Sequence, residues 1–133
     1  MLTFNAYIQN AAKLMKSKGA TVIISSQTPN NPCEGGPCSA APNRFSTYAQ
    51  QSAAATSSGY IDHWTYVYNM DVKIGSTATN AFYPNDHTHT SPAGADAYAQ
   101  AFVKGLSCSS LSLKSYINAA GSAVNGNLYC LYF

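Results

Sequence analysis

Charged side chains are scarce in this sequence. Asp, Glu, Lys and Arg make up 9% of its 133 residues, whereas about a quarter is typical of soluble domains. The basic side chains form no stripe, and the formal net charge is +2, which argues against a nucleic-acid partner. Polarity comes instead from Ser, Thr, Asn, Gln and Tyr, as it often does in secreted proteins.

Long apolar runs are absent too. No run approaches the roughly 20 residues that a membrane-spanning helix needs, so no membrane partner is expected. The first residues, "MLTFNAYIQN", lack the basic start and long apolar segment of a signal peptide. The hydrophobic fraction of 46% is nevertheless sufficient for a folded core. The length fits one ordinary domain or a piece of a larger one.

The cysteines favour disulfides over a metal site. Four cysteines allow three pairings. Cys33–Cys38 would close the "CEGGPC" loop, and Cys108–Cys130 would tie down the tail, whereas no second close Cys or His pair completes a zinc site. Disulfides imply an oxidising compartment. A secreted composition without an export signal therefore predicts that the true N-terminus is missing from this sequence.

Helical and strand patterns alternate along the chain and predict an α/β architecture. A helix is expected over residues 3–18, and its inward stripe consists of Phe4, Tyr7, Ile8, Ala11 and Met15. The apolar run 20–26 is typical of a parallel strand buried on both faces. The Pro- and Gly-rich loop 27–42 follows its carboxyl end, where open α/β sheets place binding sites.

The rest of the chain continues this pattern with one more strand. Two credible strands leave parallel edges unpaired, which again indicates part of a domain. The expected elements are a helix capped by Asn43 with Phe45, Tyr48, Ala49 and Ala53 inward, a strand over 59–62, a helix over 63–75, a loop over 76–90, and a helix from the cap Ser91 through Pro92 to Lys104.

The stretch "NDHTHTSPAG" at 85–94 concentrates ionisable groups just before the last of these helices. Asp86 and His89 are three residues apart, a spacing that can bring a carboxylate to the imidazole Nδ1. A histidine that acts as a general base needs such a carboxylate to fix its tautomer and stabilise the imidazolium. Asp86 and His89 are therefore candidate catalytic residues.

Two other interpretations of this stretch remain open. D-x-x-H arises by chance in about one chain in ten of this composition, and an Asp before a helix is often only a cap or turn residue. Alternatively, His87 and His89 with Asp86 form an H-x-H metal site of the kind found in metallohydrolases. Neither Ser25 nor Ser26, at the end of a predicted strand, lies in a G-x-S-x-G nucleophile setting.

The longer motifs resemble a known family. "DHTHTSPAGA" followed by a helix is similar to the last conserved block of the SGNH (GDSL-type) hydrolases. The segments "TFNAYIQNAAKLMKSKGATVIISSQTPNNP", "YIDHWTYV", "YPNDHTHTSPAGA" and "SLKSYI" resemble the rhamnogalacturonan acetylesterases within that superfamily, so the resemblance covers nearly the whole chain.

The resemblance implies a fold and two site residues. The fold would be the C-terminal part of a flavodoxin-like three-layer α/β/α SGNH-hydrolase domain with parallel strands, spanning residues 1–133. Asp86 and His89 would be the catalytic Asp and His, and Cys108–Cys130 the C-terminal disulfide of the family. The G-D-S block with the nucleophilic serine, and the Gly and G-x-N-D Asn of the oxyanion hole, have no counterpart in this sequence.

The implied function is a carbohydrate esterase that removes acetyl groups from pectic polysaccharide by serine acyl transfer. It requires no cofactor and acts as a secreted monomer when complete. The chain is then a C-terminal half, inactive alone, whose signal peptide and nucleophile lie upstream. The alternatives are a non-catalytic secreted carbohydrate-binding or structural protein, or a metallohydrolase using His87 and His89.

Overall fold

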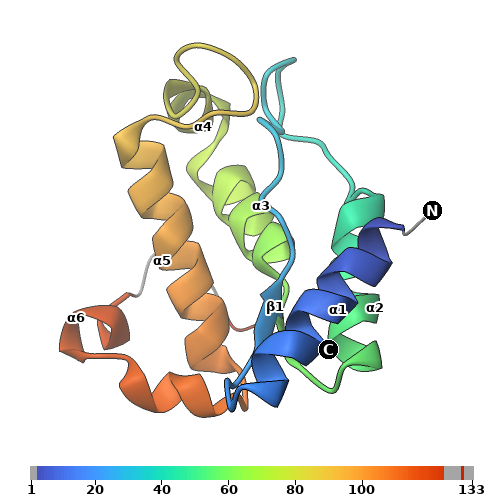
Figure 1. Ribbon diagram of the computed structural model, residues 1–133. Coiled ribbons are helices and arrows are strands. Elements are labelled where there is room, and N and C mark those ends of the chain that lie inside the picture. The colour runs from blue at the N-terminus through green and yellow to red at the C-terminus, as the bar shows by residue number, and fades with distance from the viewer. Residues whose placement is uncertain (1–2, 125–129, 131–133) are drawn as a thin grey trace.

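The computed structural model describes residues 3–124 and 130 of the chain. The described part combines helices with a small sheet of two strands (Figure 1). The elements are α1 (Phe4–Ser17), β1 (Ile23–Ser25), α2 (Arg44–Ala55), β2 (Gly59–Ile61), α3 (His63–Ile74), α4 (Ser76–Ala81), α5 (Pro92–Cys108), the 3₁₀ helix η1 (Ser112–Tyr116) and α6 (Ala119–Ser122).

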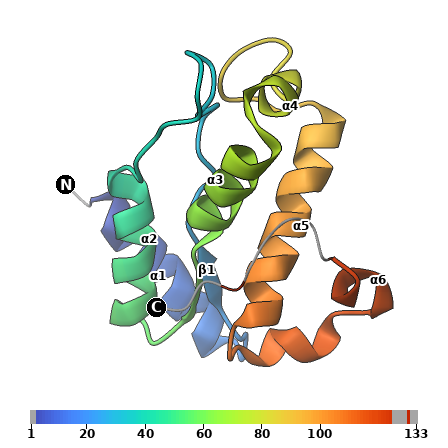
Figure 2. The ribbon, with the colours of Figure 1, turned by 180° about the vertical axis from the view of Figure 1, so that it is seen from behind.

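The sheet lies between two layers of helices. β1 and β2 pair in parallel, with Ile23 opposite Gly59 and Ser25 opposite Ile61. Both ribbon views show α1 and α2 on one side of the strands and α3 and α5 on the other (Figures 1 and 2). A parallel pair between helical layers confirms the predicted α/β class and is consistent with part of an SGNH-type domain.

The predicted inward stripe of α1 is wrong for the described structure. Helix α1 begins after the cap Thr3 as expected, but Phe4, Tyr7 and Met15 are exposed. The helix also contacts α2 through the face on which Ala12 is buried and the Lys16 ammonium donates to the Thr56 carbonyl at 2.6 Å. Within the described chain, the Phe45 and Tyr48 rings of α2 contact the Phe4 ring at the start of the stripe, while Tyr7 and Met15 stay exposed.

The stripe predicted for α2 is half right. Asn43 caps this helix by accepting from the Phe45 N–H, and Ala49 and Ala53 are buried. Phe45 and Tyr48 are only half-buried and contact the Phe4 ring at centroid distances of 5.0 and 6.2 Å. The aromatic residues of α2 therefore pack on α1 at the surface.

The predicted loop 76–90 contains a helix that the sequence prediction missed. Helix α4 follows Gly75, whose φ of 83° permits the sharp turn out of α3. Thr79 is fully buried, and its hydroxyl donates to the Asp71 carbonyl at 3.3 Å. Tertiary contacts of this kind stabilise a short helix of weak intrinsic propensity. β1 is also shorter than the predicted strand 20–26, and α5 extends beyond Lys104 to Cys108.

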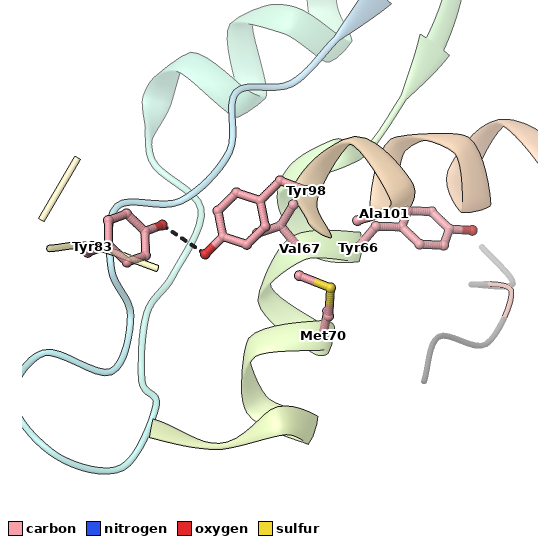
Figure 3. Close-up of a cluster of buried hydrophobic side chains, with 6 residues drawn as sticks. All are labelled: Tyr66, Val67, Met70, Tyr83, Tyr98 and Ala101. Atoms are coloured by element: carbon pink, nitrogen blue, oxygen red, sulfur yellow. Dashed lines mark hydrogen bonds between the residues drawn. The ribbon is translucent and has the colours of Figure 1, made fainter. Parts of the chain in front are cut away.

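The main core lies between α3 and α5 (Figure 3). Apolar and aromatic side chains of both helices meet there, joined by one aromatic residue from the loop that precedes α5. No helix among the described residues is long and apolar enough to cross a bilayer. The buried cluster consists of Tyr66, Val67, Met70, Tyr83, Tyr98 and Ala101.

Both predicted cysteine pairs are disulfides in the structure. Cys33–Cys38 closes the loop that follows β1, and Cys33 is fully buried. Cys108–Cys130 joins the end of α5 to the tail. The first bridge stiffens a loop at the carboxyl end of the sheet, where α/β folds place their sites.

Candidate active site

The candidate site lies on the loop 82–91 that leads into α5. Ser91 caps that helix by accepting from the Gly94 N–H at 3.3 Å, and Pro92 occupies the first turn. The Ser91 N–H also donates to the Phe82 carbonyl at 2.6 Å. This bond closes the loop at its base, so the residues between Phe82 and Ser91 project together from one end of the helix.

Glycine is required at position 94 by close packing. A Cβ there would lie 2.7 Å from the Phe82 Cβ and 3.0 Å from the Thr90 Cβ. The absence of a side chain allows the first turn of α5 to contact both ends of the loop. The "SPAG" sequence thus begins the helix and also fixes the loop before it.

Asp86 binds His89 at two places. One carboxylate oxygen accepts the backbone N–H groups of Thr88 and His89, each at 2.7 Å. The other lies 2.9 Å from the His89 Nδ1. The contact that the D-x-x-H spacing predicts is therefore present. Because a carboxylate accepts, this geometry favours the His89 tautomer that carries its proton on Nδ1.

The surroundings of the pair keep the carboxylate ionised. The hydrogen bond from the His89 backbone N–H, followed by those from the His89 ring and the Thr88 N–H, lowers the pKa of Asp86 far below its ordinary value. The His89 side chain is 82% exposed, and its Nε2 has no hydrogen-bond partner among the described residues. The arrangement presents an oriented imidazole with a free nitrogen to solvent.

The loop 27–42 lies beside this site. The Asn31 N–H donates to the His87 carbonyl at 2.7 Å, and the Thr88 hydroxyl donates to the Asn30 amide oxygen at 3.4 Å. Both ribbon views place the two loops side by side, next to α4 (Figures 1 and 2). The predicted site loop at the end of β1 therefore does meet the histidine loop.

The metal interpretation gains no support from the geometry. His87 Nδ1 lies 4.0 Å from a Glu34 carboxylate oxygen, while His89 Nδ1 contacts Asp86. The two imidazoles therefore have different partners. Within the described residues, no group of three or more His, Cys, Asp or Glu side chains is suited to hold a metal ion.

The serines at the end of β1 have structural contacts. The Ser26 hydroxyl is buried, accepts from the Trp64 N–H at 2.9 Å and donates to Asp62 at 3.3 Å. The Ser25 hydroxyl donates to the Ser26 carbonyl at 3.0 Å. In the described part of the chain, no serine hydroxyl is hydrogen-bonded to His89, so the structure brings Asp86 and His89 together without a nucleophile.

The remaining histidine, His63, is half-buried and packs beside the core. His63 Nε2 lies 2.8 Å from the Tyr98 carbonyl, and burial lowers the pKa of its imidazole. Trp64 beside it is buried, and Asp62 caps α3 by accepting from the Thr65 N–H at 3.2 Å.

The sequence analysis gave no role to a buried polar cluster beneath the site. Asp71 is 0% exposed, and burial raises the pKa of its carboxyl to about 7. The Tyr98 hydroxyl lies 3.1 Å from each of its oxygens. The available signal in the sequence was an aspartate, Asp71, next to apolar residues within the helix expected over 63–75.

Comparison with known proteins gives a clear relationship. No family model matches the chain. The rhamnogalacturonan acetylesterase of Emericella nidulans is 48% identical over 117 residues, which are 88% of this chain and 48% of that protein. The chain thus spans about half the length of the curated relative it matches. The chain is thus similar to rhamnogalacturonan acetylesterase over most of its length, which supports the SGNH-hydrolase relationship that its motifs indicate.

Proposed function

We propose that this chain supplies the Asp and His of a secreted carbohydrate acetylesterase that acts on acetylated pectic polysaccharide. Asp86 orients His89, and His89 is the general base and acid of serine acyl transfer. The nucleophilic serine and the oxyanion donors come from outside the 133 residues, so the chain alone is inactive. The relative's name supports the reaction and the substrate class.

The Asp86–His89 geometry is the observation that carries this proposal. The 2.9 Å contact at Nδ1 leaves Nε2 as the unprotonated nitrogen, and a general base must present such a nitrogen to the nucleophile. The backbone bonds to Asp86 hold the carboxylate in place before any substrate binds. A surface Asp that served only as a turn residue would not need the contact to the ring.

The chemistry follows from these two nitrogens. His89 Nε2 takes the serine proton as the serine oxygen attacks the acetyl carbonyl. The imidazolium, stabilised by Asp86, then gives that proton to the departing sugar hydroxyl. In the second half, His89 activates a water molecule that attacks the acetyl-enzyme and releases acetate. The reaction requires no metal or organic cofactor.

The test is a fusion enzyme. Residues 1–133 are joined to the part of the Emericella nidulans relative that the match leaves uncovered, and deacetylation of rhamnogalacturonan and of a chromogenic acetate is assayed. We expect turnover by the fusion and none above background by the chain alone. His89→Ala in the fusion should lower kcat by about 10³-fold or more.

His87→Ala is the matched control, because this neighbouring imidazole is also exposed and contacts only Glu34 among the ion pairs of the described residues. It should retain turnover, and EDTA should change neither rate. An active fusion that loses its activity through His87→Ala or EDTA would support the metallohydrolase instead. Turnover by the unfused chain would refute the claim that the nucleophile lies elsewhere.

A further inference from the structure

A chain of buried polar groups runs from α3 to the loop 27–42. Asp71 is fully buried, and its carboxyl oxygens lie 3.1 Å from the Tyr98 hydroxyl. That hydroxyl lies 2.9 Å from the Tyr83 hydroxyl, which in turn lies 3.2 Å from the Pro29 carbonyl. Figure 3 shows the two tyrosines meeting through their hydroxyl groups. Four residues are thus linked in series by hydrogen-bonding distances.

The number of protons in this series depends on Asp71. A phenol contributes one proton and a carbonyl none, so an ionised Asp71 leaves two protons for three contacts. In one of the three contacts, two oxygen atoms would then face each other with no proton between them. A neutral Asp71 supplies the third proton: it donates to Tyr98, Tyr98 donates to Tyr83, and Tyr83 donates to Pro29. Every contact then holds one proton.

The surroundings favour the neutral acid. Burial raises the pKa of Asp71 to about 7, and the hydrogen bond that the ionised form would accept from the Tyr98 hydroxyl opposes this shift only in part. Burial also raises the pKa of Tyr98 and of Tyr83, so both phenols keep their protons at neutral pH. Cys38, the neighbour from the loop 27–42, forms a disulfide and does not titrate. None of these neighbours is cationic.

The series connects the two loops of the candidate site. Tyr83 belongs to the loop that carries Asp86 and His89. At the other end, Pro29 lies two residues before Asn31, whose N–H donates to the His87 carbonyl at 2.7 Å. Asn31 also donates through its side chain to Asn80 at 2.8 Å. The hydrogen bond from Tyr83 to the Pro29 carbonyl therefore restrains the segment of the loop 27–42 that contacts the histidine loop.

We propose that Asp71 is a positioning residue that contributes, as a neutral acid, the proton fastening the loop 27–42 to the loop of Asp86 and His89. Only the functional benefit of this contact rests on the proposed function; the contact itself does not. Loss of the proton leaves Tyr83 with Tyr98 and Pro29 competing for its one hydrogen. The loop 27–42 is then held less firmly against His87.

The test follows the Asn31 amide by hydrogen exchange in NMR from pH 5 to 9, expressed as a protection factor relative to the Val67 amide in the core. In the wild-type chain the ratio should fall roughly fivefold as the pH rises through 7, the effect of losing one typical hydrogen bond. Asp71→Asn, a neutral side chain that can still donate to Tyr98, should give a ratio that does not change with pH.

Asp96→Asn is the matched control, because Asp96 is exposed on α5 and contacts Gln100. It should reproduce the wild-type profile. The Asp71 ¹³Cγ resonance of the wild-type chain provides a second measurement that needs no variant, and it should titrate close to pH 7. Titration below pH 5, or a pH-independent wild-type ratio, would overturn the proposal. Neither measurement uses an ester, so failure here differs from failure of the acetylesterase function.

Discussion

The Asp86 carboxylate contacts His89 through both the backbone and the ring of that residue, at 2.7 Å from the N–H and 2.9 Å from Nδ1. The backbone bond fixes the carboxylate relative to the loop, and the ring bond fixes the imidazole relative to the carboxylate. The orientation of His89 is therefore determined locally, within four consecutive residues.

Asp86→Asn should change the tautomer of His89. The amide can donate to Nδ1, which moves the imidazole proton to Nε2 and removes the base that a serine would need. We expect ¹⁵N NMR of the ring to show the Nδ1–H form in the wild-type chain and the Nε2–H form in the variant. In the fusion enzyme, kcat should fall on the order of 10³-fold or more, with KM little changed. An unchanged tautomer would contradict the assignment.

Stability should depend on pH through Asp71. Its pKa is raised from 3.8 to about 7 in the folded chain, so the folded state binds more protons than the unfolded state within that window. The free energy of unfolding should therefore decrease as the pH rises from about 4 to about 7, by at most about 1.4 kcal/mol per pH unit. Urea denaturation of Asp71→Asn should lack this slope, and Asp96→Asn should keep it.

Gly94→Ala should destabilise the base of the site loop. The new Cβ would lie 2.7 Å from the Phe82 Cβ, and such overpacking costs about 1–3 kcal/mol. Gly35→Ala is the control, since nothing lies within 4 Å of a Cβ at that position. The urea concentration at the midpoint of unfolding is measured for both variants. Equal midpoints would show that the contact between α5 and Phe82 is looser than described.

The difference in exposure between two helical leucines predicts a contrast in stability. Leu14 is 63% exposed and Leu106 is 5% exposed. Leu14→Ala should change the free energy of unfolding by less than about 0.5 kcal/mol, whereas Leu106→Ala should lower it by about 2–5 kcal/mol. A large loss for Leu14→Ala in thermal or urea denaturation would show that something covers this face in solution.

Local chemistry explains which features the sequence could predict. Thr3, Asn43 and Ser91 cap their helices through contacts with residues two or three positions away, so short patterns are sufficient to locate them. The Asp86–His89 contact spans three positions and is equally local. The two parallel strands followed from runs of apolar residues between helices.

Contacts between distant residues explain what the sequence could not predict. Asp71 and Tyr98 are 27 residues apart in the sequence, and Tyr83 and Pro29 are 54 residues apart. No local sequence pattern therefore predicts the hydrogen-bond series from Asp71 to Pro29. Likewise, α4 depends on the burial of Thr79 against α3. Periodicity identified the apolar stripe of α1, but which residues become buried depends on the neighbouring element. In the structure Ala12 is buried, whereas Tyr7 and Met15 of the stripe stay exposed.

A ligand screen on this chain should detect compounds that bind the aromatic surface of α1 and α2 as well as compounds that bind at His89. Phe4 and Phe45 meet there at 5.0 Å, and the Arg44 guanidinium lies 5.1 Å from the Phe45 centroid. Apolar dyes and aryl fragments favour such partly exposed rings with a cation beside them. Hits should therefore be sorted against Phe4→Ser: compounds that lose binding to this variant report the helix surface, and those that lose binding to His89→Ala report the site.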